Sequence, residues 1–461
     1  MTVKKLHEEC LAERYRETET VLAAIRQTLS EKGVESVTQS IETLLRDALF
    51  SDARRMLEGL LNDRTLVRDE QPARPLEVIQ KDRLRAVDTL FGVIKIKRRY
   101  YYHTKARTGR CPLDESLDLV RGHTPGLARI ICHASTHSSS FEEAAESLHA
   151  YLGLRLAGRN FGRMVAEITP ILRDAQATLP AAKDEAPSTL YISSDGTGVP
   201  LRRSELRGVK GKQPDGTART REAKLGCVFT QTKFDEEGYP VRDANSTTYT
   251  GTFEDSHHHG PQLRAEALRR GYAKAQRCVF LGDGAAWVWE LARINFPDAV
   301  PILDVWHATE HTGTLAGALF GSEEAKAHQT RWCKEMKATS SAPIITQARA
   351  LLEERRPELS AEQQETIERE IGYFETNAER TCYGAFREAG YFIGSGVIEA
   401  GCKTVVGRRL KQSGMFWSQR GGDDLLALRC MMMNPNFPQI WNARLPILKT
   451  RRSKQPRWSP S

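Results

Sequence analysis

Two Asp-Gly steps and one distant glutamate are the residues of this sequence best suited to metal chemistry. Asp195 and Asp283 each close an apolar run of the kind that forms a buried strand, and Glu399 lies in a glycine-rich stretch far downstream. A carboxylate at the end of a buried strand is held rigidly at the rim of its sheet. Three such carboxylates brought together can hold divalent metal ions for phosphoryl chemistry on nucleic acid.

Each of these residues also has a simpler interpretation. Asp-Gly is common in turns, and Glu399 could form a helical ion pair with Lys403, worth only a few tenths of a kcal/mol. Asp283, however, is followed by a helical pattern, which places it at a strand-to-helix edge where α/β proteins build their sites. If Asp195 ends a neighbouring strand, the two carboxylates face each other across one rim.

Asp304 and His307 are predicted to lie beside these carboxylates in a supporting role. Asp304 ends a further strand, and His307 and His311 follow it one helical turn apart. That spacing occurs in zinc sites, but no third ligand lies near in sequence. A packing or metal-supporting role is therefore the favoured interpretation of the two histidines.

Two groups of polar and basic residues are predicted to contact DNA. Cations that follow Glu399 suit phosphate oxygens, and two short helices around Gly153 resemble a helix-turn-helix whose second helix could enter a groove. An ordinary α-hairpin is the alternative for the latter. The predicted contacts are Lys403, Arg408, Arg409 and Lys411 in the first group, and Arg159, Asn160 and Arg163 in the second.

The elements that must position these residues follow from the hydrophobic pattern. Strands open the region after residue 186 and then alternate with helices, which predicts a mixed sheet covered by helices. A charged helical stretch separates the last strand from Glu399 and therefore has the character of an insertion. The predicted segments are 1–80 (helical), 81–120 (β-hairpin with a degenerate knuckle), 121–180 (helical, helix-turn-helix-like), 186–321 (first part of the α/β core), 322–390 (helical insertion), 391–445 (second part of the core) and 446–461 (basic disordered tail).

Composition restricts the class of protein. The 461 residues carry a net charge of +8, which suits a polyanionic partner. No apolar run approaches the roughly 18 residues of a membrane span, and the charged N-terminus does not resemble a signal peptide. Nine cysteines without a Cys-x-x-Cys pair indicate a reducing compartment and no disulfide framework.

Together these residues resemble the Asp-Asp-Glu transposases of bacterial insertion sequences, in particular the Kra-type families related to Mutator-like elements. The likeness runs from about residue 80 to about residue 445. The matching stretches are Ser-Asp-Gly-Thr-Gly-Val-Pro at 194–200, Gly-Asp-Gly-Ala at 282–285, Asp-Val-Trp-His at 304–307 and Ile-Gly-Ser-Gly-Val-Ile-Glu-Ala-Gly-Cys-Lys at 393–403.

The resemblance implies a ribonuclease-H-like core interrupted by an all-helical insertion. It implies that Asp195, Asp283 and Glu399 bind two magnesium ions, with Mn²⁺ able to substitute, and that His307 lies beside the core. The implied partners are double-stranded DNA, as element ends and target, and further copies of the chain in a homodimer or larger assembly in the bacterial cytoplasm. The sequence departs from the family at 102–114, where only fragments of a cysteine knuckle remain.

Two other functions are compatible with parts of the pattern. In a haloacid-dehalogenase-type phosphatase Asp195 would be phosphorylated, but a helix should then follow Thr197, where the sequence favours an extended chain. A DNA-binding protein without cleavage activity would bind DNA in the presence of a chelator and form no product.

Overall fold

The structure is a computed structural model that describes residues 37–180, 186–209, 213 and 216–454, together with scattered positions between 19 and 30. Within these residues, no helix combines the length and the apolar character needed to cross a lipid bilayer. The chain divides into two compact units. The first comprises Met1–Ser135, Ser140–Met164 and Leu448–Ser461, and the second Thr136–Ser139 and Val165–Ile447.

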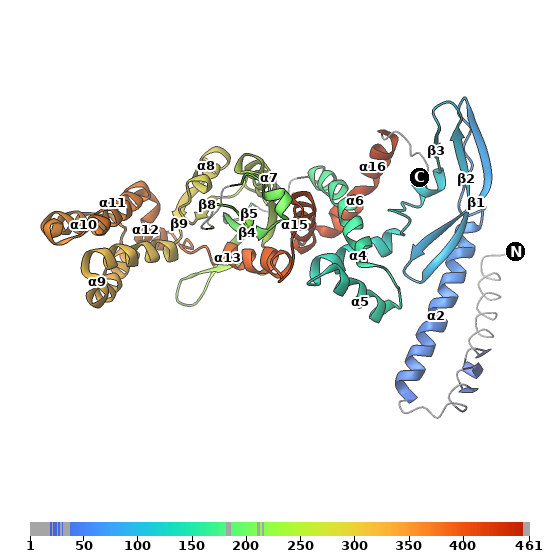
Figure 1. Cartoon of the computed structure of the whole chain (residues 1–461), viewed down its shortest axis with the longest axis horizontal. Coiled ribbons are helices and arrows are strands. Elements are labelled where there is room, and N and C mark those ends of the chain that lie inside the picture. Colours follow the sequence, from blue (N-terminus) through green and yellow to red (C-terminus); the bar gives the residue numbers. More distant parts are fainter. Residues whose placement is uncertain are drawn as a thin grey trace. The chain divides into compact units, whose positions relative to one another are not determined.

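The first unit combines a long helix with a small antiparallel sheet. Helix α2 (Val37–Asn62) packs on β2 (Gly92–His103), which pairs with β1 (Glu77–Thr89) and β3 (Thr108–Arg110) (Figure 1). Gly92 has φ +110°, a value that favours glycine, directly after the turn of the hairpin. The core of this sheet consists of Val87, Ile94, Ile96, Leu113 and Leu119.

Three helices follow the sheet, after the short α3 (Pro112–Ser116): α4 (Pro125–His137), α5 (Phe141–Leu152) and α6 (Gly158–Ala177). Ser140 caps α5 by accepting a hydrogen bond from the Glu143 N–H, and Gly153 ends it in the left-handed region. The sequence predicts that α6 ends near Ile168, but it continues to Ala177. The helix continues because apolar residues recur at helical spacing and are buried, namely Ile168, Ile171, Leu172 and Ala175.

The second unit is built on a mixed sheet with the strand order β6-β5-β4-β8-β9, and β7 also pairs with β5. β4 is antiparallel to β5 and parallel to β8, and β8 is parallel to β9. The strands are β4 (Thr189–Pro200), β5 (Thr220–Phe234), β6 (Pro240–Arg242), β7 (Thr248–Thr252), β8 (Arg277–Gly282) and β9 (Val300–Leu303).

One strand is longer than the sequence indicates. The pattern predicts that β4 ends at Asp195, but it continues to Pro200 and pairs with β5 along its whole length, with Asp195 opposite Leu225. The glycines at 196 and 198 are tolerated because β8 no longer flanks this part of β4, whose pairing with β8 stops at Ser193. Asp195 therefore lies at the end of the β4–β8 ladder and not at the end of β4.

Helices cover both faces of this sheet (Figure 1). α7 (Ser256–Arg269) packs on β5 and β7, and α8 (Ala286–Asn295) packs on β8. On the other side, α13 (Gly396–Gly401) packs on β4 and β5, whereas α15 (Gln419–Met433) packs on β7. The last described helix is α16 (Phe437–Lys454).

The stretch between β9 and α13 is helical, as the sequence predicts. It contains α9 (Val305–Ala338), α10 (Ala342–Arg355), α11 (Ala361–Thr376) and α12 (Tyr383–Glu388), grouped beyond the β9 edge of the sheet (Figure 1). α9 is kinked at Gly321, whose φ is +71°. Ser360 and Gln363 form a complete capping box on α11.

Candidate active site

Three aspartates gather where neighbouring parallel strands end. Ser193 pairs with Leu281, so Asp195 and Asp283 each follow two residues beyond the last paired position of the β4–β8 ladder. On the next strand Leu303 pairs with Gly282, and the Asp304 N–H donates to the Gly282 carbonyl at 2.8 Å. The strand register thus brings all three carboxylates to one edge of the sheet.

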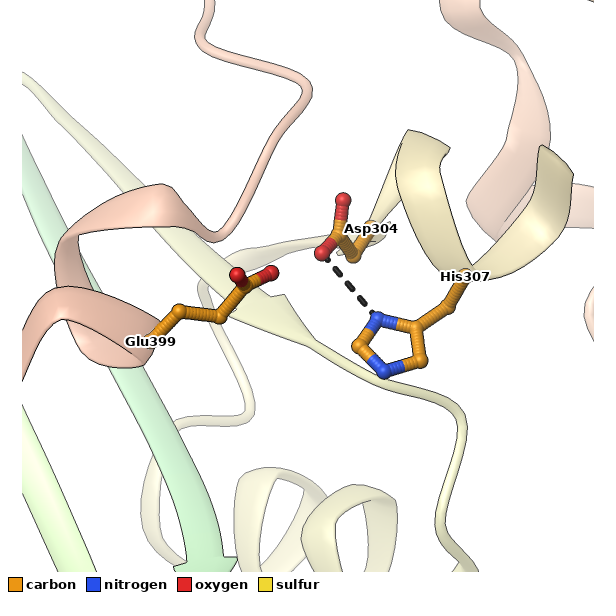
Figure 2. Close-up of side chains that lie close together, drawn as sticks. All are labelled: Asp304, His307 and Glu399. Carbon is orange, nitrogen blue, oxygen red and sulfur yellow. Dashed lines mark hydrogen bonds and ion pairs between the residues drawn. The ribbon is translucent and has the colours of Figure 1, made fainter. Parts of the chain in front are cut away.

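A glutamate from the second half of the core completes the site. Glu399 lies on α13, and its carboxylate points toward Asp304 and His307 (Figure 2). One potential ligand atom from each of these three residues lies within 4.8 Å of the other two. In the described part of the chain, this is the group of His, Cys, Asp and Glu side chains close enough together to hold one ion.

Asp304 is the anchor of this group. It is fully buried and accepts hydrogen bonds from the Trp306 N–H (2.9 Å), His307 Nδ1 (3.1 Å) and the Ser395 hydroxyl. Burial alone would raise its pKa, but the hydrogen bonds from His307, Ser395 and Trp306 together lower it. Asp304 is therefore ionised at neutral pH in spite of its burial.

His307 carries the matching positive charge. Its hydrogen bond to Asp304 raises the pKa of its imidazole to about 9, and the charges of Asp304 and Asp283 add to the effect against the opposing cost of burial. At neutral pH the ring is thus a cation between carboxylates. A metal ion that took His307 as a ligand would have to displace this proton.

Asp195 and Asp283 form the second part of the site. Burial raises the pKa of Asp195, and the negative charge of Asp283 adds to the increase, whereas hydrogen bonds from the Cys402 thiol (3.3 Å) and the Gly196 N–H oppose it. A divalent cation would relieve this repulsion and favour the ionised form of Asp195. Asp195, Asp283 and Glu399 each offer carboxylate oxygens, the type of ligand that Mg²⁺ prefers.

The structure brings together a different trio from the one that the sequence emphasises. Asp304 and His307, expected only to support the metal ligands, lie in direct reach of Glu399. Asp195 and Asp283 interact with each other and with His307 through their charges. The five side chains therefore belong to one site with two adjoining parts.

Glu399 does not form the helical ion pair with Lys403 that is its simple interpretation. Its neighbour along the helix is Ser395, whose hydroxyl lies 3.4 Å from Glu399 Oε1. The segment Cys402–Gly407 is π-helical and leads into the short α14 (Arg408–Leu410). The wider π turn changes which side chains share a face, and Lys403 is exposed to solvent.

The predicted DNA contacts differ in accessibility. Lys403, Arg408 and Lys411 are exposed, and Lys411 donates to the Thr197 hydroxyl beside the site. Arg409 corrects the prediction: it is 1% exposed, donates to the Ser139 carbonyl at 3.0 Å and lies over the Trp417 ring. Its guanidinium is therefore used inside the protein, in the short helix that follows the π-helical segment.

In the helix-turn-helix-like region, Arg159 and Arg163 are exposed on the first two turns of α6, and Asn160 between them is partly buried. The two arginines are four residues apart and so share one face of the helix.

Sequence reasoning misses His259. The pattern at 257–259 indicates an exposed loop, but these residues form the first turn of α7, and His259 is fully buried with Nε2 3.1 Å from the Ser194 hydroxyl. Burial, with a smaller effect of Lys224, lowers the pKa of His259 to about 3, so the ring is neutral. The signal that could have found it is Asp255, which caps the helix by accepting from the His258 N–H.

Tyr373 of the insertion is also missed. Its ring stacks on His311 (centroids 3.6 Å apart), and His311 pairs with Glu370 at 2.6 Å. A Cβ atom on Gly284 would lie 2.5 Å from the Tyr373 hydroxyl oxygen. Burial raises the Tyr373 pKa, and the charge of Asp283 adds to the rise. The insertion thus packs directly on the loop that carries Asp283.

Comparisons with known proteins give a family model and distant likenesses among solved structures. Residues 26–436 match the family model described as Uncharacterised protein family (UPF0236). No curated protein matches the sequence. Among solved structures, the Drosophila P element transposase strand transfer complex matches with 10% identity and a TM-score of 0.23, over 71% of this chain and 80% of that one.

Proposed function

The chain belongs to the Uncharacterised protein family (UPF0236), and from the geometry of its carboxylate site we propose that it is a metal-dependent DNA transposase. The observation that carries the proposal is the convergence of Asp195, Asp283 and Asp304 at one sheet edge with Glu399 from a distant helix. Such a site suits phosphoryl transfer, in which positioned charge contributes most of the catalysis.

The sheet topology supports a ribonuclease-H-like core. β7, β5 and β4 are successive antiparallel neighbours, and β8 and β9 add parallel strands on the other side of β4. This order places one acidic residue on β4, another after β8 and a glutamate on a helix after the insertion. It agrees with the arrangement that the resemblance to Asp-Asp-Glu transposases implies.

In the proposed mechanism Asp195, Asp283 and Glu399 would hold magnesium ions near the scissile phosphate. Bound there, the metal would activate water or a 3′-hydroxyl and stabilise the leaving oxygen. Asp304 and Ser395 orient the Glu399 carboxylate, since the Ser395 hydroxyl lies within reach of both. The His307 imidazolium offsets part of the negative charge of the carboxylates until DNA and metal bind.

Double-stranded DNA is the proposed partner, bound as element ends and target by a homodimer or larger assembly. Exposed Lys403, Arg408 and Lys411 follow Glu399, and Lys411 already contacts β4 two residues beyond Asp195. Cations at these positions can neutralise phosphates on either side of the scissile bond. The alternative phosphatase is disfavoured because β4 continues as a strand after Asp195.

The test is cleavage of the DNA that naturally flanks the gene, with and without Mg²⁺, by the wild type and by Glu399→Gln. Glu365→Gln, which changes an exposed carboxylate of α11, is the matched control. We expect metal-dependent cuts by the wild type and the control and none by Glu399→Gln. Equal products from Glu399→Gln, or cuts that survive chelation, would contradict the assigned site. Binding without any cut would favour a DNA-binding protein that lacks cleavage activity.

A further inference from the structure

An exposed tryptophan borders the carboxylate site. Trp306 is 58% exposed, although it lies in the first turn of α9, two residues after the buried Asp304. The backbone N–H of Trp306 donates to Asp304 Oδ1 at 2.9 Å, which fixes the backbone of Trp306 to the site. A single exposed aromatic residue is unremarkable elsewhere on a protein surface, but this one is tied to a carboxylate that reaches Glu399 and His307.

The indole ring is also held in place by two neighbours. Lys337, from the part of α9 beyond the kink at Gly321, places its ammonium nitrogen 4.8 Å from the ring centroid. Gly394 lies against the edge of the ring, since a Cβ atom there would lie 3.4 Å from Trp306 Nε1. The ring is thus oriented by a cation and by the loop leading to Ser395, while more than half of the residue stays open to solvent.

We propose that Trp306 is a stacking platform for an unpaired nucleobase next to the phosphate held at the carboxylate site, with Lys337 contacting a neighbouring phosphate. This inference rests on the proposed function, since DNA must reach the site. A strand whose phosphate lies at metal ions beside Glu399 has its adjoining base within reach of Trp306, because ligand atoms of Glu399 and Asp304 lie within 4.8 Å of each other and Trp306 follows Asp304 by two residues. Aromatic rings bind unpaired bases of any sequence because every base has a π face.

The ligand is single-stranded or locally opened DNA, because a base inside an intact duplex offers no free face. Stacking would hold the strand open on one side of the cleavage point while the carboxylates hold the phosphate. The alternative is a purely structural role, in which the Trp306 ring only packs against Lys337 of the insertion. The test must distinguish this role from base stacking.

The experiment measures the fluorescence of 2-aminopurine placed singly at each position around the cleavage point of the flanking DNA. All proteins carry Glu399→Gln so that binding is measured without cleavage. Trp306→Ala and Trp306→Phe are compared with Tyr239→Ala, which removes another exposed aromatic ring with a cation nearby, from Arg387.

We expect a fluorescence change at one position of the DNA with the parent protein, with Tyr239→Ala and with Trp306→Phe, which keeps an aromatic ring. The change should disappear in Trp306→Ala, and single-stranded DNA should bind to that variant about tenfold more weakly, as the removal of one stacked base predicts. If Trp306 only packs against Lys337, the fluorescence change should remain in Trp306→Ala.

Equal fluorescence changes in the Trp306→Ala and parent proteins would overturn the proposal. If the alanine variant fails to fold, Trp306→Gln takes its place. A cleavage assay with Glu399 intact separates this inference from the proposed function. A stacking signal without any metal-dependent cleavage contradicts the catalytic part of the proposed function and leaves the DNA binding on which the inference rests. Cleavage without a stacking signal contradicts the inference alone. A wild type that binds no DNA overturns both.

Discussion

At the scale of single residues, the site is organised by hydrogen bonds around Asp304. Its three donors are a helix N–H, an imidazole and the Ser395 hydroxyl, and they keep a fully buried carboxylate ionised. In the proposed metal site, residues that orient the ligands would contribute about 10–100-fold to metal affinity or activity. Ser395 and His307 can therefore be tested separately from the carboxylates.

Ser395→Ala is expected to raise the Mg²⁺ concentration for half-maximal cleavage about tenfold, because Glu399 and Asp304 lose the hydroxyl between them. Cleavage at saturating Mg²⁺ should largely recover. The measurement is a Mg²⁺ titration of DNA cleavage, with Ser360→Ala as a control that removes a capping hydroxyl of the helical insertion. An unchanged Mg²⁺ midpoint would mean that Ser395 does not position Glu399.

His307 predicts a pH dependence of stability in metal-free buffer. Its folded-state pKa of about 9 lies above the value of 6.5 for a free histidine. The ion pair with Asp304 therefore contributes its full stabilisation below about pH 6.5 and loses it as the pH rises through about 9. The difference in free energy of unfolding between wild type and His307→Gln, measured by urea denaturation with a chelator, should shrink over this range. A constant difference would show that the charge of His307 is not involved.

At the scale of elements, the helical insertion and the Asp283 loop are packed together. Gly284 has φ +94°, and a Cβ atom there would lie 2.5 Å from the Tyr373 hydroxyl oxygen of α11. Only glycine takes this backbone conformation without strain. Because Tyr373 of the insertion approaches the residue next to Asp283 so closely, the packing of the insertion helps to set the position of Asp283.

Gly284→Ala should accordingly cost about 1–3 kcal/mol of stability and reduce cleavage, because it strains the backbone and displaces Tyr373. Gly372→Ala is the matched control, since no atom within 4 Å would oppose its Cβ in the interior of α11. That control should be neutral or stabilising by up to about 1 kcal/mol. Urea denaturation of both variants gives the comparison, and equal stabilities would contradict the close approach.

At the scale of the whole molecule, the first compact unit carries its own predicted DNA-binding residues. Arg159 and Arg163 are exposed on one face of α6, in the part of that helix assigned to this unit. Because counterion release governs binding to duplex DNA, removing a cation that neutralises a phosphate should weaken binding and lower its salt dependence.

The double variant Arg159→Ala/Arg163→Ala should bind duplex DNA more weakly than the wild type. The slope of log affinity against log salt should fall in magnitude by about 0.9 for each of the two arginines that neutralises a phosphate. Arg293→Ala, which removes an exposed arginine of α8 paired with Glu290, is the control. Binding is measured by fluorescence anisotropy across a salt series. A slope equal to that of the wild type would mean that Arg159 and Arg163 do not contact phosphates and that α5 and α6 form an ordinary packed α-hairpin.

Much of the architecture could be predicted from local patterns. The apolar runs before Asp195 and Asp283, the helical insertion and the caps at Ser140 and Ser360 all reflect residues a few positions apart. The ends of β4 and α6 are misjudged from the sequence because tertiary contacts extend both elements. β4 continues because it pairs with β5, and α6 continues because its apolar face is buried.

What the sequence by itself determined is the order of the elements and the candidate carboxylates that they carry, because hydrophobic periodicity and capping are local. Only the tertiary structure decided which side chains meet. Ser395 bonds to Asp304 across 91 residues, Cys402 reaches Asp195 across 207, and Arg409 turns inward. Such contacts depend on the pairing of strands and on helix rotation, here altered by a π-helical turn, and no local pattern encodes them.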